Sequence, residues 1–376
     1  MLKKEHITCP ITHENFRLPV LACDGFFYEE YAIKRWLLSH NTSPMTGLPI
    51  EKNTTVCIFF NNLLKEYYEA HPDETPQEIP NEKIIGTCLA TLAHHNAVSS
   101  LAIAPNGEYI FSCLSDGTIQ IWDFSSHDCY AKLVGQSNGV CSVAITPDSK
   151  HFVFGSDDHS IEIWNFTRFA GVAKLKGHKQ HVYSLAITPD GKHIVSGSLD
   201  DTVKIWDFAS RTCVATLALH SNTVWAVAIT PDGKHVVSGS SDCSIKIWDF
   251  TSHKFIATLR GHKKCVSTVA ITPDGKHIVS GSSDRFIKIW DLASRMCVAT
   301  LAGHTCGVKT VTITPDGKHI FSGSWDDTIK IWDFASRACI ATLDEHNDAV
   351  QSLAITPDGK HLVSGSDDHT IKIWEM

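Results

Sequence analysis

Histidine, serine and aspartate stand at fixed spacing in this sequence, for example as His178, Ser196 and Asp200. These residue types can form a relay in which the histidine takes a proton from the serine hydroxyl and the aspartate orients the histidine. The same trio recurs in six of the seven copies of a sequence repeat, however, and no enzyme needs six copies of one relay. We therefore expect a structural role for these residues.

A repeat of 42 residues organises most of the chain, because a tryptophan that follows Ile returns at that interval. Within one copy, residues 182–198 (VYSLAITPDGKHIVSGS) form two apolar runs around a TPDG turn, where Pro and Gly favour a chain reversal. Two further strands follow. A period of this length that ends in Trp-Asp is typical of a four-stranded propeller blade, and seven copies indicate one closed ring. The seven tryptophans are Trp122, Trp164, Trp206, Trp248, Trp290, Trp332 and Trp374.

The order of strands along the chain predicts how the ring closes. The sequence stops at Met376, after the third strand of the last copy, and a spare strand at residues 87–92 (TCLATL) precedes the first copy. We expect this strand to complete the last blade, because an open ring would expose free strand edges.

The repeat resembles the WD40-repeat family. That family places a hydrogen-bonded set of His, Ser or Thr, Asp and Trp in each blade, and the third copy matches it with His178, Ser196, Asp200 and Trp206. The second copy departs, with Gln136 in the place of His and Phe154 in the place of Ser. Because both losses fall in one copy, we expect a locally weaker blade with one altered packing solution.

Positions that vary between these near-identical repeats are candidates for binding. Five residues past the loop histidine position stand Ser99, Cys141, Tyr183, Trp225, Ser267, Lys309 and Gln351. One residue before the turn aspartate stand Ser115, Asp157, Leu199, Ser241, Ser283, Trp325 and Asp367.

Both positions are expected on one face, near the mouth of the channel, where an aromatic residue suits an interface hot spot. Tyr183, Leu199 and Trp225 come from adjacent blades and are expected to form one patch beside His181. The alternative is a scatter of exposed apolar residues, which is normal on protein surfaces. The predicted substrate-binding residues are Tyr183, Leu199, Trp225, Lys309 and Trp325, of which the last two share one blade.

The remaining sequence predicts two further parts. Residues 1–70 share no repeat with the rest and are expected to form a separate domain, and residues 71–83 are rich in Pro and Glu, as in a linker. The propeller then spans 84–376. The first domain resembles the U-box family in CPIT (9–12), LPV (18–20), DGFFY (24–28), SPMTG (43–47) and the pair Leu64 and Lys65 after Asn61.

The resemblance implies a small α+β, RING-like fold without zinc, followed by the all-β propeller. It also implies a groove that binds a ubiquitin-conjugating enzyme, with Ile11 in the first loop, Trp36 on a helix and Pro44 in the second loop. The alternatives are core packing for Trp36 and a purely structural loop role for Ile11 and Pro44. Such an interface is expected to be small and transient.

Together these resemblances imply an E3 ubiquitin-protein ligase with two protein partners, a conjugating enzyme carrying ubiquitin and a substrate held on the propeller. Such a ligase has no nucleophile of its own and gains rate from proximity and orientation. The alternative is a non-enzymatic scaffold with a degenerate U-box. A bacterial effector acting in a host cell is a third possibility.

Composition limits the other functions. The net charge of −8 argues against generic binding to nucleic acid or to an anionic membrane. The start of the sequence lacks an apolar stretch as long as a secretion signal needs, so we expect a cytoplasmic protein, with the nucleus or the cytosol of a host cell as alternative locations.

The chain has 13 cysteines but no CxxC, which predicts no metal and no cofactor. Cys129, Cys213, Cys297 and Cys339 share one repeat position and are expected to be free, half-buried strand residues.

Overall fold

The computed structural model describes residues 19–22, 27–29, 54–56, 86–133 and 139–376. The chain divides into two compact units, Met1–Glu82 and Lys83–Met376. In the first unit, β1 (Pro19–Ala22), β2 (Phe27–Glu29) and β3 (Thr54–Val56) form an antiparallel sheet in the order β2-β1-β3. The helices expected in this unit fall outside the described residues. Among the described residues, no helix is long and apolar enough to cross a membrane.

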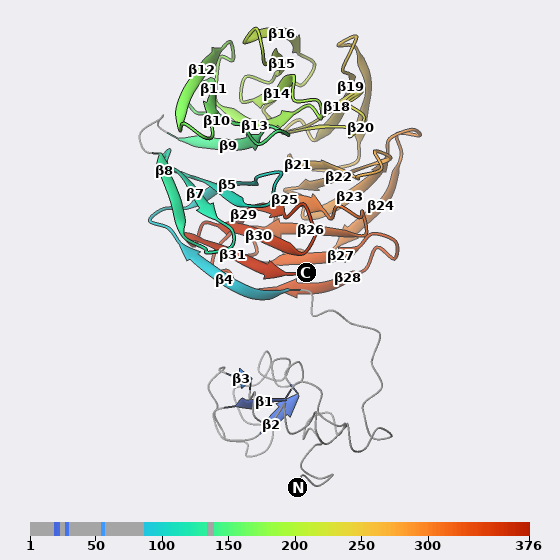
Figure 1. Cartoon of the computed structure of the whole chain (residues 1–376). Helices are drawn as coiled ribbons and strands as arrows, with labels where there is room; N and C mark the ends of the chain where they lie inside the picture. The colour runs from blue at the N-terminus through green and yellow to red at the C-terminus, as the bar shows by residue number, and fades with distance from the viewer. Residues whose placement is uncertain (1–18, 23–26, 30–53, 57–85, 134–138) are drawn as a thin grey trace. The chain divides into compact units, whose positions relative to one another are not determined.

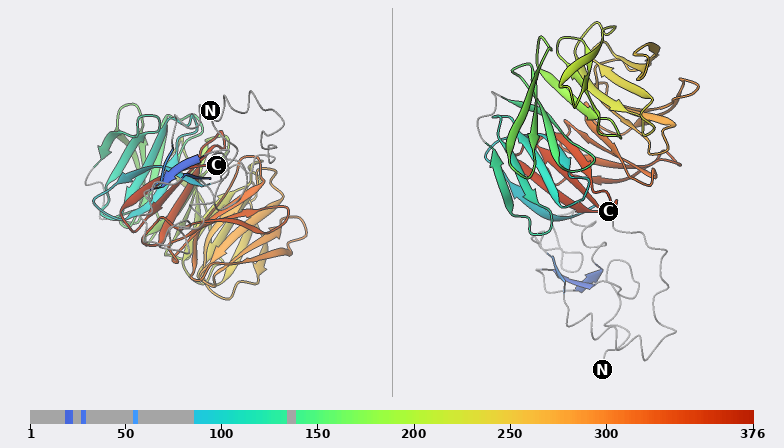
Figure 2. Two further views of the ribbon diagram at one scale, coloured as in Figure 1. Left: turned by 90° about the horizontal axis from the view of Figure 1, so that it is seen from below. Right: turned by 45° about the horizontal axis from the view of Figure 1, so that its top comes forward.

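The second unit is a seven-bladed β-propeller, in which seven four-stranded antiparallel sheets surround a central channel (Figures 1 and 2). We number the blades along the chain and give their strands from the channel outward. Blade 1 comprises β5 (Val98–Ile103), β6 (Tyr109–Leu114), β7 (Ile119–Asp123) and β8 (Cys129–Leu133). Blade 2 comprises β9 (Val140–Ile145), β10 (His151–Ser156), β11 (Ser160–Asn165) and β12 (Ala170–Lys176). Blade 3 comprises β13 (Val182–Ile187), β14 (His193–Ser198), β15 (Val203–Asp207) and β16 (Thr212–Leu217).

The other four blades continue the same order. Blade 4 comprises β17 (Val224–Ile229), β18 (His235–Ser240), β19 (Ser244–Asp249) and β20 (Phe255–Arg260). Blade 5 comprises β21 (Val266–Ile271), β22 (His277–Ser282), β23 (Phe286–Asp291) and β24 (Cys297–Ala302). Blade 6 comprises β25 (Val308–Ile313), β26 (His319–Ser324), β27 (Ile329–Asp333) and β28 (Cys339–Leu343). Blade 7 comprises β29 (Val350–Ile355), β30 (His361–Ser366), β31 (Thr370–Glu375) and β4 (Thr87–Ala93).

The ring is closed by strands from both ends of the propeller. β4 pairs antiparallel with β31, with Leu92 opposite Ile371 and Ala90 opposite Ile373. The amide of Gly86 also donates a hydrogen bond of 2.8 Å to the carbonyl of Glu375. β4 is therefore the fourth strand of blade 7, and no blade of the ring lacks its outer strand.

The first turn of blades 3 to 7 depends on the sequence TPDG, where blade 1 has APNG and blade 2 has TPDS. In blade 3, the Thr188 hydroxyl and the Lys192 amide donate hydrogen bonds of 2.6 and 3.1 Å to the Asp190 carboxylate. Gly191 adopts φ +71°, a region in which a side chain is unfavourable, and its amide donates to the carbonyl of Thr188. The turn residues thus fix the register in which the first and second strands pair.

The apolar core lies between neighbouring blades, where the sheets pack face to face. Val195, Ile205 and Leu217 of blade 3 pack against Val224 and Trp248 of blade 4. The contact is close enough that a Cβ atom added to Gly197 would lie 2.8 Å from a methyl group of Val224, which explains a glycine inside a strand.

Five blades hold the predicted hydrogen-bonded set in full. In blade 4, His220 Nδ1 lies 2.7 Å from Asp242, its Nε2 lies 2.8 Å from the Ser238 hydroxyl, and that hydroxyl accepts a hydrogen bond of 3.1 Å from the Trp248 indole. Because the imidazole, the hydroxyl and the indole are buried, each polar atom depends on this pairing. The five histidines are His178, His220, His262, His304 and His346.

The expectation of six complete sets is wrong, because blade 1 departs as well. His94 Nδ1 contacts the side-chain oxygen of Gln120 at 2.5 Å, and Asp116 instead contacts His95 at 2.8 Å. Where blade 1 has Gln120, blade 3 has Lys204, which offers no acceptor for a histidine. The Trp122 indole still donates to Ser112, at 3.1 Å.

Blade 2 shows the altered packing solution that its sequence predicts. Phe154 is fully buried and packs beside Trp164, with ring centroids 6.2 Å apart. The Trp164 indole donates to Glu162 at 3.0 Å, and the Lys174 ammonium donates to Glu162 and to Asp158 at 2.8 and 2.7 Å. An ionic network therefore replaces the missing hydroxyl. Gln136 lies outside the described residues, and the weaker stability of this blade stays a prediction.

The four cysteines that share a repeat position differ from expectation in their exposure. Cys129, Cys213, Cys297 and Cys339 are free, but they are exposed and not half-buried. They begin or nearly begin the outermost strand of their blades, which pairs with one other strand among the described residues.

Removal of one buried hydroxyl is expected to destabilise the propeller measurably. Ser238→Ala leaves the Trp248 indole and His220 Nε2 without their partner, which should lower the free energy of unfolding by about 1–3 kcal/mol. Thermal and urea unfolding of the full chain measure this loss. The matched control is Ser221→Ala at an exposed position of the same blade, and an equal effect of the two substitutions would contradict the buried role.

The same sets predict how stability depends on pH. Burial lowers the pKa of His220 and His346 below the usual 6.5, although hydrogen bonds to Asp242 and Asp368 oppose the shift. In the unfolded chain these histidines take up protons at higher pH, so the unfolded state binds more protons below about pH 6.5. We expect the free energy of unfolding to fall between pH 7 and 5, as measured by urea unfolding. A constant or rising value over that interval would contradict this account.

Candidate binding site at the channel mouth

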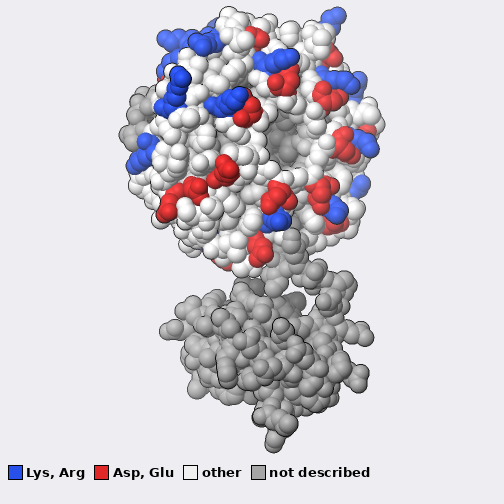
Figure 3. All heavy atoms as spheres, in the orientation of Figure 1, with Lys and Arg blue, Asp and Glu red and all other residues white. Residues whose placement is uncertain are grey.

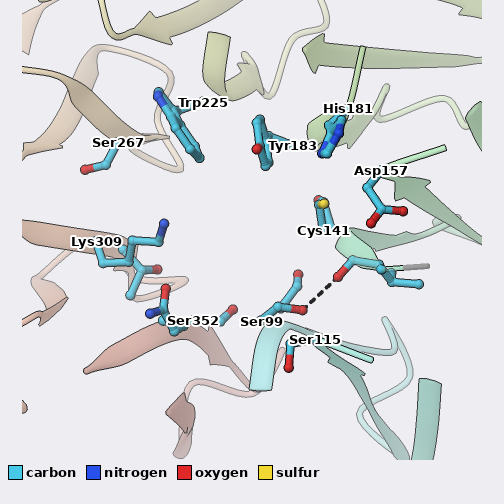
Figure 4. Close-up of a pocket in the computed structure, with 16 residues that line it drawn as sticks. Ser99, Ser115, Cys141, Asp157, His181, Tyr183, Trp225, Ser267, Lys309 and Ser352 are labelled. Carbon is cyan, nitrogen blue, oxygen red and sulfur yellow. Dashed lines mark hydrogen bonds between the residues drawn. The ribbon is translucent and has the colours of Figure 1, made fainter. Parts of the chain in front are cut away.

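One end of the central channel opens into a cavity of about 380 Å³. The innermost strand of every blade contributes to its wall, so the cavity exists only in the assembled ring (Figure 4). The seven positions that lie five residues past the loop histidine position all line it: Ser99, Cys141, Tyr183, Trp225, Ser267, Lys309 and Gln351.

Alternation along the innermost strand explains why these positions vary. In β13, Val182 is fully buried between blades, whereas Tyr183 is half-buried and faces the cavity. In β17, Val224 and Trp225 repeat this arrangement. The valine is held to one residue type by packing, but the next side chain points away from the core, so its identity is free to serve binding.

Two aromatic side chains form a stacked pair on one wall. The ring centroids of Tyr183 and Trp225 are 4.3 Å apart with an angle of 24° between the planes. The Trp225 indole donates a hydrogen bond of 2.7 Å to Ser241, which fixes the orientation of the ring. Because both rings are only half-buried, the pair offers a flat apolar surface to a ligand.

A lysine completes this wall. The Lys309 ammonium lies 5.1 Å from the centre of the Trp225 ring, although its strand, β25, is two blades away from β17. The intervening strand contributes only the small Ser267, whose hydroxyl donates to the carbonyls of Gly281 and Val308. Burial lowers the pKa of Lys309, and the nearby Cys265 and Asp367 only partly oppose this shift.

The opposite wall carries a carboxylate and a thiol. Cys141 and Asp157 lie across the cavity from Lys309 (Figure 4). Burial and the negative charge of Asp157 raise the pKa of Cys141 to about 11. The thiol is therefore protonated at neutral pH and is a poor nucleophile. The cavity is thus equipped for binding and not for thiolate chemistry.

Histidines extend the aromatic wall outward. The rings of His181 and Tyr183 have centroids 6.0 Å apart, and His159 stacks on His181 at 5.7 Å. A row of four rings therefore runs from His159 to Trp225.

Three of the five predicted substrate-binding residues lie together in the structure, and two lie apart from them. Tyr183, Trp225 and Lys309 line one cavity, and Lys309 contacts Trp225 from another blade. Leu199 and Trp325 do not line it. Leu199 is half-buried in the turn beside His181, and Trp325 is 49% exposed in its own turn. Tyr183 and Trp225 therefore meet across adjacent blades, whereas Lys309 reaches Trp225 from two blades away because its side chain is long.

The sequence placed Cys141 and Asp157 at the two variable positions expected near the channel mouth, but they were not among the predicted substrate-binding residues, which are aromatic or long side chains. A simpler sequence pattern identifies the cavity-lining residues, because the residue directly after the buried valine of each innermost strand faces the cavity.

The predicted groove for the conjugating enzyme has no geometry in this structure. Ile11, Trp36 and Pro44 all lie outside the described residues, and their roles stay predictions.

Basic and acidic side chains lie close together around the ring on the face shown in Figure 3, and the channel appears as a hollow at its centre. Exposed pairs such as Lys234 with Asp232, at 3.4 Å, recur in the turns between the first and second strands. Such exposed pairs contribute little to stability. On the face in view basic side chains gather at the upper left and acidic ones at the lower left, and elsewhere the two signs are mixed.

Comparison with known proteins assigns both parts of the chain. The family model for the U-box domain matches residues 5–68. The family model for the WD domain, G-beta repeat, matches seven segments: 86–123, 127–165, 170–207, 211–249, 253–291, 295–333 and 337–375.

Several curated proteins are similar to this chain over short stretches. U-box domain-containing protein 35 of Arabidopsis thaliana is 39% identical over 62 residues, which are 16% of this chain and 6% of that protein. WD repeat, SAM and U-box domain-containing protein 1 of Danio rerio is 48% identical over 48 residues, or 12% of this chain and 10% of that protein. A protein of Acanthamoeba polyphaga mimivirus, named a probable bifunctional E2/E3 enzyme, is 35% identical over 65 residues, or 17% of this chain and 5% of that protein.

These similarities cover only a small part of each relative, between 5% and 10% of its length. The seven repeat matches, in contrast, span most of the chain, and each comprises the outer strand of one blade followed by the three inner strands of the next. The chain therefore belongs to the WD40-repeat family, as a seven-bladed propeller preceded by a U-box domain.

Proposed function

We propose that this protein is an E3 ubiquitin-protein ligase, in which the U-box recruits a ubiquitin-loaded conjugating enzyme and the propeller binds the substrate. The observation that carries the proposal is the presence of a U-box at 5–68 and a complete propeller from residue 86 in one chain. The name of the mimiviral relative, an E2/E3 enzyme, supports the same reading of the U-box.

The proposed reaction needs no nucleophile on this chain. A lysine amine of the substrate attacks the thioester between ubiquitin and a cysteine of the conjugating enzyme, an amide bond forms, and the cysteine thiolate leaves. The ligase contributes by holding the two reactants close together in a productive orientation, which raises their effective concentration. The raised pKa of Cys141 agrees with a binding role for the channel mouth.

The propeller suits the substrate-binding role because its mouth combines rigidity with apolar and charged groups. Trp225 is held by Ser241 and stacks on Tyr183, so little freedom is lost when a partner covers the pair. Trp and Tyr are also the residue types that most often carry binding energy at interfaces. Trp325, which is exposed outside the cavity, is proposed as a peripheral contact, together with Leu199.

The proposal places the protein in the cytoplasm. Five free cysteines of the described propeller residues are exposed: Cys129, Cys213, Cys297, Cys306 and Cys339. Exposed free thiols are typical of a reducing compartment, where disulfides seldom form.

Autoubiquitination in a reconstituted reaction tests the ligase activity. With a panel of conjugating enzymes, the wild-type chain should form ubiquitin conjugates, and Ile11→Ala or Pro44→Ala should reduce the rate by about tenfold or more, as expected when about 1.4 kcal/mol of binding is lost. The expected cause is the loss of the apolar contact with the conjugating enzyme.

Trp225→Ser is the matched control, because it alters the propeller mouth and leaves the U-box intact. It should retain autoubiquitination at the wild-type rate. A wild-type chain that forms no conjugate with any conjugating enzyme would overturn the proposal in favour of a scaffold. Activity that is unchanged in Ile11→Ala and Pro44→Ala would refute the groove assigned to these residues.

A further inference from the structure

The ammonium group of Lys309 lacks a direct counter-ion, although Asp367 lies near enough to act on it through space. Among the residues that the structure describes, it forms no hydrogen bond and no ion pair, and its contact is the face of the Trp225 ring at 5.1 Å. Buried or half-buried charges in proteins are normally paired, because removal from water is costly. Burial accordingly lowers the pKa of Lys309. A long side chain of this kind can usually reach solvent, but this one points into the channel mouth beside Trp225 (Figure 4).

Neighbouring polar groups are already engaged and cannot relieve Lys309. Ser267 donates its hydroxyl to backbone carbonyls, and the amide of Gln351 donates to Asp367 at 2.5 Å. Asp367 is therefore hydrogen-bonded to Gln351, and it acts on the lysine through space without forming an ion pair with it. The lysine is left as a charged donor that faces an open cavity of about 380 Å³.

We propose that the channel mouth binds an acidic side chain, Asp or Glu, from an extended segment of the substrate, with its carboxylate on Lys309 and the flanking apolar part on the Tyr183–Trp225 pair. This inference rests on the proposed role of the propeller as the substrate-binding part. The cavity volume fits one side chain and its stem, whereas the stacked rings and His181 extend the contact to neighbouring residues of the segment.

The charges that line the cavity favour a carboxylate over a phosphate group. A phosphate carries about −1.5 to −2 charges at pH 7 and is normally held by several cationic donors. Here Lys309 is the one lysine or arginine among the described residues that line the cavity, and Asp157 on the opposite wall repels a doubly charged phosphate more strongly than a singly charged carboxylate. A single carboxylate matches the single ammonium, and its charge-assisted hydrogen bond is among the stronger kinds.

Selection from a random heptapeptide phage library, with the full-length protein immobilised, tests this inference. We expect sequences with Asp or Glu to be enriched by about tenfold over sequences with Asn or Gln, as a charge-assisted hydrogen bond predicts. Lys309→Met should abolish this enrichment, and Lys309→Arg should preserve part of it. The matched control is Lys318→Met, in an exposed turn of the same blade, which should behave as wild type.

Three outcomes would overturn the inference. They are no acidic enrichment with the wild type, the same enrichment with Lys309→Met, and tighter binding of a phosphoserine peptide than of its glutamate counterpart in fluorescence polarisation. Autoubiquitination by the same protein preparations distinguishes this failure from failure of the proposed function. A wild-type preparation that forms ubiquitin conjugates but shows no acidic preference contradicts the peptide inference alone.

Discussion

The pairing of β4 with β31 is the constraint on which the rest of the propeller depends. It joins residues 87–93 to 370–375, so both ends of the propeller sequence share one sheet. Without it, blade 7 would end in an unpaired strand, and the ring would have an edge that can open. The cavity at the channel mouth draws residues from all seven innermost strands, so its shape follows from ring closure.

Scaffold and binding functions are divided between neighbouring residues of the same strand. Val224 is buried and holds blades 3 and 4 together, and Trp225, directly after it, faces the channel. The hydrogen-bonded sets work in a similar way, because His220 and Ser238 stabilise blade 4 from within and leave the channel free. A rigid ring can therefore carry different side chains at its mouth without loss of the fold, as the exchange of Tyr, Trp, Ser and Lys between repeats illustrates.

Much of the fold was predictable, because a repeat of constant length leaves little freedom in strand order and turn geometry. The polar sets were less predictable. Gln120 and Glu162 differ from the lysine that stands there in other blades, and each accepts a hydrogen bond, from the half-buried His94 or from the buried Trp164. The candidate site was predicted only in part. The face and the seven cavity positions follow from alternation, but the contact of Lys309 with Trp225 depends on side-chain reach between blades that are not adjacent.

Hydrogen exchange of the full chain tests ring closure most directly. The account predicts that the β31 amides that face β4 exchange as slowly as those of inner strands such as β30, because their release requires the ring to open. Rapid exchange of these amides, at the rate of an unpaired edge strand, would show that β4 is not stably bound. That result would contradict both the closed ring and the channel mouth that depends on it.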